Sequence, residues 1–286
     1  MLRNLIIREN QLIRLVKEIG EVITTDKVRG YSFDWDDNIL FMPTKIKMEK
    51  KESLRWIPVN VSTEEFVELR KNPDYRLTDH AFMDFQDPQT FISDTKKAIE
   101  DEKFAPSFDK LKESLIYANP FSIITARGTP SHAIKESIRI LIGMTFDTEE
   151  VNKMVSNIEK TYPSTKNMPM DEKIDFYLSK NDYSAVTSDE FKDKFGLDVD
   201  ADNPEEGKKI ALKDYVDRVV NGVRKLTDGE YDRLSIGFSD DDRRNIDVVI
   251  DYIRNELSVE YPGVEFFIYD TSQGEKNKII ISKLTD

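Results

Sequence analysis

Apolar positions along the chain fall into two alternating patterns. Short runs of consecutive apolar residues are typical of strands buried on both faces, and apolar residues three and four apart are typical of helices that cover them. The strands that these runs predict are 31–34 (YSFD), 120–125 (PFSIIT), 182–188 (DYSAVTS), 233–238 (RLSIGF), 264–270 (VEFFIYD) and an edge strand at 278–284. The helices predicted by the second pattern are 12–23, 107–118, 131–142, 205–220 and 246–257.

Strands that alternate with helices predict an α/β fold, in which a parallel, doubly wound sheet is covered on both faces. In such folds a ligand binds at the carboxyl ends of the strands. Asp34, Thr125 and Asp240 stand at or just beyond the ends of three predicted strands. We therefore expect these polar side chains to share one edge of the sheet.

The segment after the first strand has a different pattern. Two stretches of alternating polarity around Lys50–Ser53 predict a hairpin. A helix should follow, with Ser62 or Thr63 as its cap and Glu65 near the third helical position. The aromatic-rich residues 74–91 are expected to be irregular, and the residues between Thr145 and Asp175 form a polar region.

Composition limits the classes of function. The 286 residues carry a formal net charge of -13, which argues against a general nucleic-acid coat or an anionic membrane as partner. There are no cysteines, so thiolate catalysis, disulfides and cysteine-ligated metals are excluded. Charges interrupt every apolar stretch near the N-terminus, so we expect no signal peptide and no membrane span, and a cytoplasmic location.

The sequence SFDWDDNIL, residues 32–40, places three aspartates directly behind an apolar run. Neighbouring carboxylates repel one another unless protons, hydrogen bonds or a cation offset their charge. Taken alone, such a cluster is typical of a solvated turn, because acidic residues make up 55 of the 286. Its significance comes from the motifs that follow it in order.

The chain resembles the haloacid dehalogenase (HAD) superfamily, which is dominated by magnesium-dependent phosphatases. The resemblance rests on FDWDDNIL, SIITARG, GKKIALKDY and SIGFSDDDRRNI, which are similar to the four motifs of that superfamily and span residues 31–246. The resemblance implies a three-layer, Rossmann-like HAD fold with a parallel central sheet and an inserted cap. It also implies a hydrolase that forms an aspartyl-phosphate.

The resemblance assigns roles to individual residues. Asp34 would be the nucleophile, and Asp36 would protonate the leaving group and then activate water. Thr125 would bind a phosphoryl oxygen, and Lys208 would pair with phosphate and restrain the nucleophile. Mg²⁺ would be held by the side chains of Asp34 and Asp240 and by the backbone carbonyl of Asp36. Asp241 would be a further ligand or would stand directly behind the ligands. Phosphoryl transfer requires such neutralisation of charge on the transferred group.

Several assignments stay open at this level. Lys209 is the alternative to Lys208, and Asp242 is interpreted as a helix cap rather than a metal ligand. Arg127 and Asn38 are the candidate substrate-binding residues. The superfamily usually has Gly and Thr where this chain has Asp37 and Asn38. The acid at position 36 favours phosphatase or phosphomutase chemistry over dehalogenase chemistry.

The expected organisation has three parts. An N-terminal helical segment covers 1–29, a HAD-like core covers 30–44 and 105–286, and the cap covers 45–104. A second insertion is expected within the core at about 145–206. The cap would determine which phosphomonoester is bound, and the sequence does not indicate the oligomeric state.

The predicted function is a Mg²⁺-dependent phosphatase that acts on a phosphorylated small molecule or nucleotide. The alternative is a nucleotide or polynucleotide end-phosphatase. Five Lys or Arg against two Glu between Lys45 and Arg55 give the hairpin a charge of +3. Such a hairpin is more often simply solvated, and the functional alternative is a clamp for a phosphorylated polymer or nucleotide, so nucleic acid is a possible but not a favoured partner. A HAD-fold binding or scaffold protein without catalysis is the further alternative.

Overall fold

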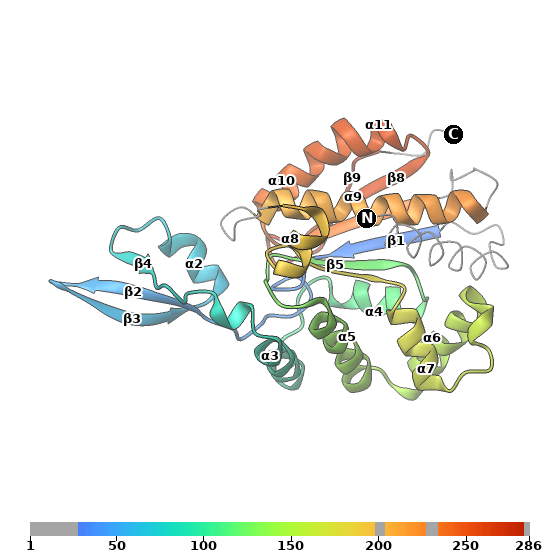
Figure 1. Ribbon diagram of the computed structural model, residues 1–286, viewed down its shortest axis with the longest axis horizontal. Coiled ribbons are helices and arrows are strands. Elements are labelled where there is room, and N and C mark those ends of the chain that lie inside the picture. Colours follow the sequence, from blue (N-terminus) through green and yellow to red (C-terminus); the bar gives the residue numbers. More distant parts are fainter. Residues whose placement is uncertain (1–27, 198–203, 227–233, 283–286) are drawn as a thin grey trace.

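The computed structural model describes residues 28–197, 204–226 and 234–282 (Figure 1). A six-stranded sheet forms the centre, in the order β6-β5-β1-β7-β8-β9. The first five of these are parallel, and β9 is antiparallel to β8. Their bounds are β6 Asp182–Ala185, β5 Phe121–Thr125, β1 Val28–Phe33, β7 Leu234–Asp240, β8 Val264–Asp270 and β9 Asn277–Ile280.

The sheet confirms the predicted α/β class and a mostly parallel strand arrangement, with the edge strand as the exception. Each predicted strand of the sheet is present, because runs such as FSIIT bury every side chain when helices cover both faces. The N-terminal helical segment was predicted over 1–29. Residues 1–27 lie outside the described residues, and residues 28 and 29 begin β1.

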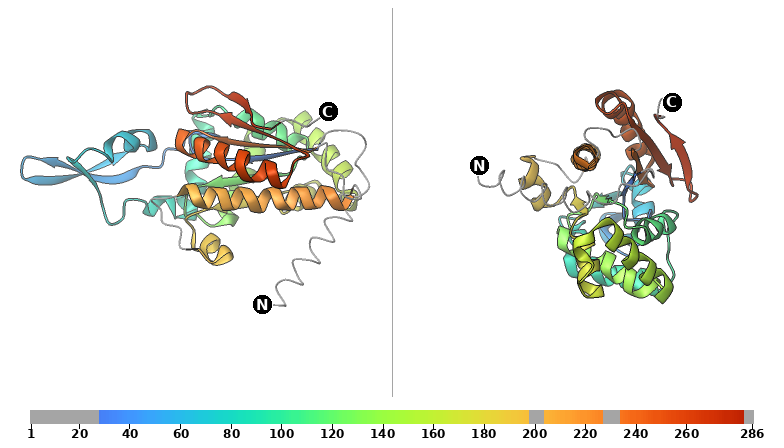
Figure 2. Two further views of the ribbon diagram at one scale, coloured as in Figure 1. Left: turned by 90° about the horizontal axis from the view of Figure 1, so that it is seen from above. Right: turned by 90° about the vertical axis from the view of Figure 1, so that its right-hand side faces the viewer.

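Helices cover both faces of the sheet (Figures 1 and 2). On one face, Tyr31, Phe33 and Ile123 belong to a core cluster with α3 to α7. On the other face, Ile236 and Phe238 pack with α9 and α10. The bounds of these helices are α3 Pro88–Glu100, α4 Phe108–Ile116, α5 Ser131–Thr145, α6 Thr148–Thr161, α7 Met170–Leu178, α9 Pro204–Leu226 and α10 Arg243–Tyr252.

Short elements complete the described chain. They are α8 Asp189–Phe195, a π-helical turn η3 Ile253–Leu257 with α11 Ser258–Glu260 after it, and two 3₁₀ turns, η1 Met83–Phe85 and η2 Pro163–Thr165. Within the described residues, no helix is both long enough and apolar enough to cross a membrane.

Residues 46–77 form a separate small sheet that projects away from the central one, and we call this segment the arm (Figures 1 and 2). It contains β2 Ile46–Glu52, β3 Arg55–Val61, α2 Thr63–Leu69 and β4 Tyr75–Leu77, with the strand order β3-β2-β4. The predicted hairpin and helix are both confirmed, and Ser62 and Glu65 form a reciprocal capping box at the start of α2.

The projecting part is shorter than the cap predicted at 45–104. Helix α3 is absent from the prediction, yet it packs into the main core through Phe91, Ala98 and Ile99. The arm has its own small cluster, which ends at Phe85. The chain therefore returns to the core near residue 87, because α3 has an apolar face that matches α5 and not the arm.

The segment predicted as a second insertion at 145–206 is also part of the core. Residues 145–175 contain α6 and α7, where the sequence analysis noted only a polar region. Val151, Met154, Val155 and Ile158 recur at helical spacing on α6, and Met154 and Ile158 are buried in the main core. Strand β6, in the same segment, is an edge of the central sheet.

Candidate active site

The polar residues expected at the strand ends converge at the carboxyl edge of the sheet. Asp34 follows β1, Asp240 ends the neighbouring strand β7, and Thr125 ends β5 on the other side. Phe33 is in register with Ser239, so the next residues, Asp34 and Asp240, emerge side by side. One carboxylate oxygen each of Asp34, Asp240 and Asp241 lie within 4.8 Å of one another.

A buried lysine lies among these acids. The Lys208 ammonium, on the N-terminal part of α9, lies 2.7 Å from Oδ2 of Asp240 and 3.1 Å from Oδ1 of Asp34. Its side chain is 1% exposed. A lysine this deeply buried requires paired carboxylates, because a lone ammonium would lose its hydration without compensation.

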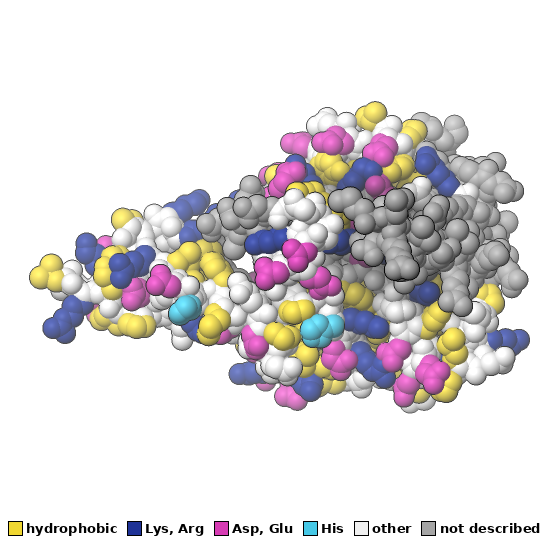
Figure 3. All heavy atoms as spheres, in the orientation of Figure 1, with side chains coloured by type: hydrophobic (Ala, Val, Ile, Leu, Met, Phe, Trp, Pro, Cys, Tyr) yellow, Lys and Arg dark blue, Asp and Glu magenta, His cyan; other side chains and the backbone are white. Residues whose placement is uncertain are grey.

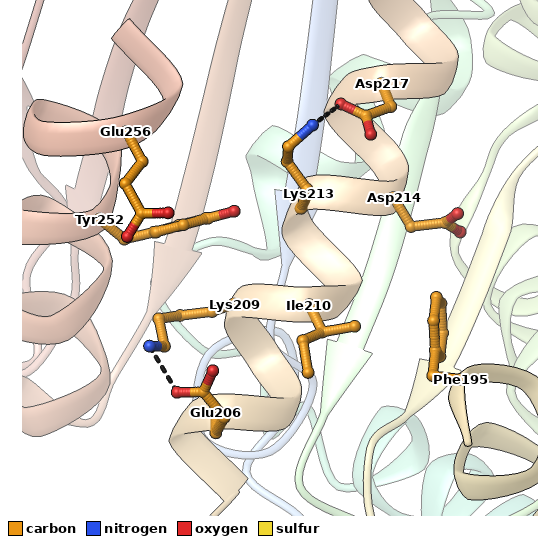
Figure 4. Close-up of a pocket in the computed structure, with 9 residues that line it drawn as sticks. All are labelled: Phe195, Glu206, Lys209, Ile210, Lys213, Asp214, Asp217, Tyr252 and Glu256. Carbon is orange, nitrogen blue, oxygen red and sulfur yellow. Dashed lines mark hydrogen bonds and ion pairs between the residues drawn. The ribbon is translucent and has the colours of Figure 1, made fainter. Parts of the chain in front are cut away.

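The alternative lysine lies elsewhere. Successive residues of an α-helix are about 100° apart around its axis, so the side chain of Lys209 leaves α9 on a different side from that of Lys208. Lys209 pairs with Glu206 in a surface pocket of about 320 Å³ between α9 and α10, which also includes Tyr252 and contains none of the candidate site residues (Figure 4). Lys208 is therefore the lysine of the candidate site.

Three acids and one lysine leave this cluster with excess negative charge. Burial raises the pKa of Asp34 well above its usual value, and although Lys208 opposes this shift, Asp240 adds to it. Burial likewise raises the pKa of Asp241, together with repulsion from Asp240 and Asp34. Burial disfavours the Lys208 ammonium, but Asp240 and Asp34 outweigh that effect and raise the pKa of Lys208.

These features fit a hard divalent cation. Oδ1 of Asp34 is buried and accepts no well-aligned hydrogen bond within the described part of the chain, in spite of the nearby Lys208. Carboxylate oxygens are the ligands that Mg²⁺ prefers in proteins, and Mg²⁺ usually keeps several waters beside them. Asp34, Asp240 and Asp241 could therefore hold such an ion, which would offset the surplus charge.

Asp240 is held from several directions. Its Oδ1 accepts hydrogen bonds from the backbone N–H of Asp242, at 2.9 Å, and from the Asn245 amide, at 3.0 Å. The carboxylate of Asp242 accepts from the Arg244 backbone, so Asp242 caps α10 as predicted. Sequence reasoning missed Asn245, because an asparagine in the first turn of an amphipathic helix gives no separate signal.

Asp36 lies beside Asp34 in sequence but is engaged by Arg127. Nε of Arg127 donates to both Asp36 oxygens, at 3.1 and 2.8 Å, and Nη2 donates to Oδ1 at 2.6 Å. Arg127 is 2% exposed. This geometry differs from the predicted contact with a substrate phosphate, because the guanidinium is buried and bound to a protein carboxylate.

Thr125 connects the same group to the end of β5. Its hydroxyl lies 3.5 Å from Oδ2 of Asp36 and accepts a 3.3 Å hydrogen bond from the backbone N–H of Arg127. The residue is 1% exposed. The structure thus brings Thr125 to Asp36, while its predicted contact with a phosphoryl oxygen stays a prediction.

Asn38 has a structural position in place of the predicted substrate contact. Its amide nitrogen donates to the carbonyls of Asp34, at 3.0 Å, and Ser239, at 3.3 Å. Its amide oxygen accepts 2.9 Å hydrogen bonds from the hydroxyls of Ser239 and Thr271. The side chain is fully buried, so Asn38 fixes the ends of β1, β7 and β8 and has no free polar atom for a substrate.

Asp37 explains the departure from the usual glycine. Its φ is 55°, in the left-handed region that glycine adopts most easily and aspartate tolerates better than most residues. Its carboxylate accepts a 2.5 Å hydrogen bond from the hydroxyl of Thr63, at the start of α2 in the arm. Burial raises the pKa of Asp37 to about 6. Sequence reasoning missed this contact between the segment after β1 and the arm.

Comparison with protein-family models, with curated proteins and with solved structures finds no match to this chain. The residues at the carboxyl edge of the sheet therefore carry the functional inference.

Proposed function

We propose that this protein is a Mg²⁺-dependent phosphohydrolase of the HAD superfamily, which acts on a phosphomonoester through an aspartyl-phosphate. One observation carries the proposal: Asp34, Asp240 and Asp241 bring carboxylate oxygens within 4.8 Å of one another, and buried Lys208 contacts two of these acids. The four motifs that suggested the superfamily thus supply residues to one edge of one sheet.

In the proposed first step, an oxygen of Asp34 attacks the phosphorus atom of the substrate. The bond from phosphorus to the ester oxygen breaks, and Asp36 gives its proton to the departing alkoxide. In the second step a water attacks the same phosphorus atom and gives a proton to Asp36. This step releases phosphate and restores the Asp34 carboxylate.

The other residues act on orientation and charge. Lys208, 3.1 Å from Asp34, restrains the nucleophile and adds positive charge close to the transferred group. Asn38 fixes the backbone carbonyl of Asp34 and so the direction in which this residue leaves β1. A Mg²⁺ ion held by Asp34, Asp240 and Asp241 would supply further neutralisation of the phosphoryl charge.

The test is the hydrolysis of p-nitrophenyl phosphate by the full chain, with Mg²⁺ or with EDTA. We expect turnover that requires Mg²⁺ and that falls to background in Asp34→Asn, which keeps the size of the side chain but not the nucleophile. Asp109→Asn, on α4, serves as the matched control and should keep full activity. Turnover that persists in Asp34→Asn would exclude the proposed mechanism.

A phosphorylated polynucleotide end is the second candidate substrate. The observation that favours it is the basic hairpin at 45–55, which also exposes apolar side chains, on a molecule that is otherwise strongly acidic (Figure 3). Lys51 and Arg55 are exposed near the turn of the hairpin, and Leu54 between them is 98% exposed. Positive charge of this kind suits a phosphate backbone.

A phosphomutase would use the same acids, and a scaffold protein would use none. A sugar phosphate separates these alternatives, because a mutase transfers the phosphoryl group to a second hydroxyl of such a substrate and releases little phosphate. A scaffold protein would give no turnover with any phosphomonoester and no Mg²⁺-dependent change in stability.

A further inference from the structure

Arg127 lies at the junction between the arm and the core. Two segments join the arm to the core, residues 41–45 and 78–87, and we call them together the arm base. Nη2 of Arg127 donates a 2.8 Å hydrogen bond to the hydroxyl of Thr44 in the arm base. Thr44 in turn donates to Asp94 on α3, at 2.5 Å.

Two aromatic rings enclose the same guanidinium. Its central carbon lies 4.6 Å from the centre of the Phe85 ring, in the arm base, and 5.0 Å from that of Phe91, on α3. A guanidinium between two rings is stabilised by cation–π attraction, more strongly where water is excluded. Phe85 also belongs to the apolar cluster of the arm, so Arg127 contacts the arm through a residue of the arm's own core.

The Nε–Nη2 edge of the guanidinium, whose Nη2 also contacts Thr44, determines where Asp36 points. Its three hydrogen bonds from Nε and Nη2 occupy both carboxylate oxygens. Such a planar, two-pronged contact fixes orientation in a way that a lysine ammonium does not. Asp36 must lie in one place relative to Asp34 if it is to transfer a proton in both steps.

We propose that Arg127 is a positioning residue, which holds the Asp36 carboxylate beside Asp34. Through Arg127, the position of Asp36 depends on how the arm base packs against the core. The inference rests on the proposed function for its catalytic part. Arg127 does not touch the substrate in this account. It acts through Asp36 on one side, and through Phe85 and Thr44 on the other.

The first experiment compares kcat and KM for p-nitrophenyl phosphate in wild type, Arg127→Ala and Arg127→Lys. We expect kcat to fall about 100-fold in Arg127→Ala, the lower end of what acid–base catalysis contributes, with KM within about threefold of wild type. Added guanidinium should restore part of the kcat of Arg127→Ala. Arg127→Lys should recover little, because one ammonium cannot make the two-pronged contact.

Two comparisons separate positioning from a general structural role. In an Asp36→Asn background, Arg127→Ala should cause no further loss of kcat, because the arginine acts through Asp36. Phe85→Leu in the arm base should lower kcat in the same direction, whereas Val259→Ala, at an exposed position of α11, should not. Additive losses in the double variant, or no rescue by guanidinium, would overturn the positioning role.

The link to the arm has a readout that is independent of activity. The backbone N–H groups of Phe85 and Gln86 donate hydrogen bonds to the carbonyls of Phe82 and Met83. The rate of their hydrogen exchange therefore reports on the local stability of the arm base. In Arg127→Ala we expect their exchange to accelerate about tenfold, which corresponds to about 1.4 kcal/mol of lost local stability. Arg139→Ala, which removes the Arg139–Asp175 ion pair between α5 and α7, is the control.

The outcomes distinguish the two proposals. If wild type turns over no phosphomonoester, the proposed function fails, and the catalytic part of the inference fails with it. The exchange experiment still decides whether Arg127 holds the arm base. If wild type is active and kcat is unchanged in Arg127→Ala, only the positioning role is wrong, and the proposed function stands.

Discussion

At the scale of single residues, the segment 34–38 after β1 contains acids whose position could be predicted and contacts that could not. Asp34 and Asp240 could be placed from the sequence, because an acid directly behind an apolar run must emerge at the end of a buried strand. The engagement of Asp36 by Arg127 could not, since the two residues are 91 positions apart and meet only when β1 and β5 pair. Asn38 shows the same limit, because its four partners include groups on β7 and after β8.

Asp37 makes stability depend on pH. Burial raises its pKa from 3.8 to about 6, so the folded chain binds a proton that the unfolded chain has released between these values. The free energy of unfolding should therefore fall as pH rises from about 4 to about 6. In Asp37→Asn the contribution of this residue to the decrease in unfolding free energy should be absent, because asparagine keeps an acceptor for Thr63 but does not ionise.

The measurement is urea unfolding of both proteins at a series of pH values, with EDTA present so that no cation alters the nearby acids. We expect the difference in unfolding free energy, wild type minus Asp37→Asn, to decrease across this interval by about 1–2 kcal/mol, after allowance for partial exposure. A difference that stays constant with pH would contradict the assignment.

Asn38 should be important for stability. Asn38→Ala removes the partner of two buried carbonyls and two buried hydroxyls, so we expect the free energy of unfolding to fall by about 2–4 kcal/mol. Asn167→Ala, at an exposed position, should change it by less than about 0.5 kcal/mol. Urea unfolding of the two variants makes the comparison, and equal small losses would show that the Asn38 network contributes little.

Asp240 should be required for cation binding. Mg²⁺ at about 100 times its dissociation constant should raise the free energy of unfolding of wild type by about 2.7 kcal/mol. The increase should be absent in Asp240→Asn and present in Asp242→Asn, because asparagine at 242 still caps α10. Thermal unfolding with and without Mg²⁺ measures it.

The same increase should shrink as pH falls. Burial raises the pKa values of Asp34 and Asp241, and these carboxylates must lose their protons to bind a cation. If Mg²⁺ raised the free energy of unfolding equally in wild type and in Asp240→Asn, the ion would bind at a site other than the one that contains Asp240.

At the scale of elements, strands were easier to predict than helices with narrow apolar faces. Strand β5 buries all five of its side chains, so its sequence is unbroken and apolar. Helix α6 buries only Met154 and Ile158, but Val151 and Val155 extend this face at helical spacing, so the sequence carried a signal for this helix that was missed. Helix α3 was missed because its apolar face matters only once α5 is placed beside it.

The arm gives a prediction of its own. If polynucleotide ends are substrates, Lys50→Glu with Lys51→Glu should raise the KM for a 3′-phosphorylated oligonucleotide at least tenfold, because the arm would then repel the phosphate backbone. The KM for p-nitrophenyl phosphate should not change. Lys160→Glu with Lys166→Glu, at exposed positions of the core, is the charge-matched control. Equal effects of the two pairs would argue against a role for the arm.

At the scale of the whole molecule, the proposed function requires an acidic chain to bind a phosphate group. Alternation of strands and helices was enough to predict a mostly parallel sheet with a site at its carboxyl edge. The net charge of -13 would repel a phosphomonoester, and within the described residues Lys208 and Arg127 are both buried against acids. The proposed reaction therefore requires a bound cation, and it requires Asp34 as the nucleophile.

The most direct test of this account is detection of a phosphoryl group on Asp34. The protein would be mixed with a phosphomonoester and Mg²⁺, quenched in acid, and reduced with borohydride, which converts an acyl phosphate of aspartate into homoserine. Peptide mass spectrometry should then find homoserine at position 34 in wild type, and none in samples without Mg²⁺. Turnover of the substrate without homoserine at position 34, or homoserine at another aspartate, would contradict the account.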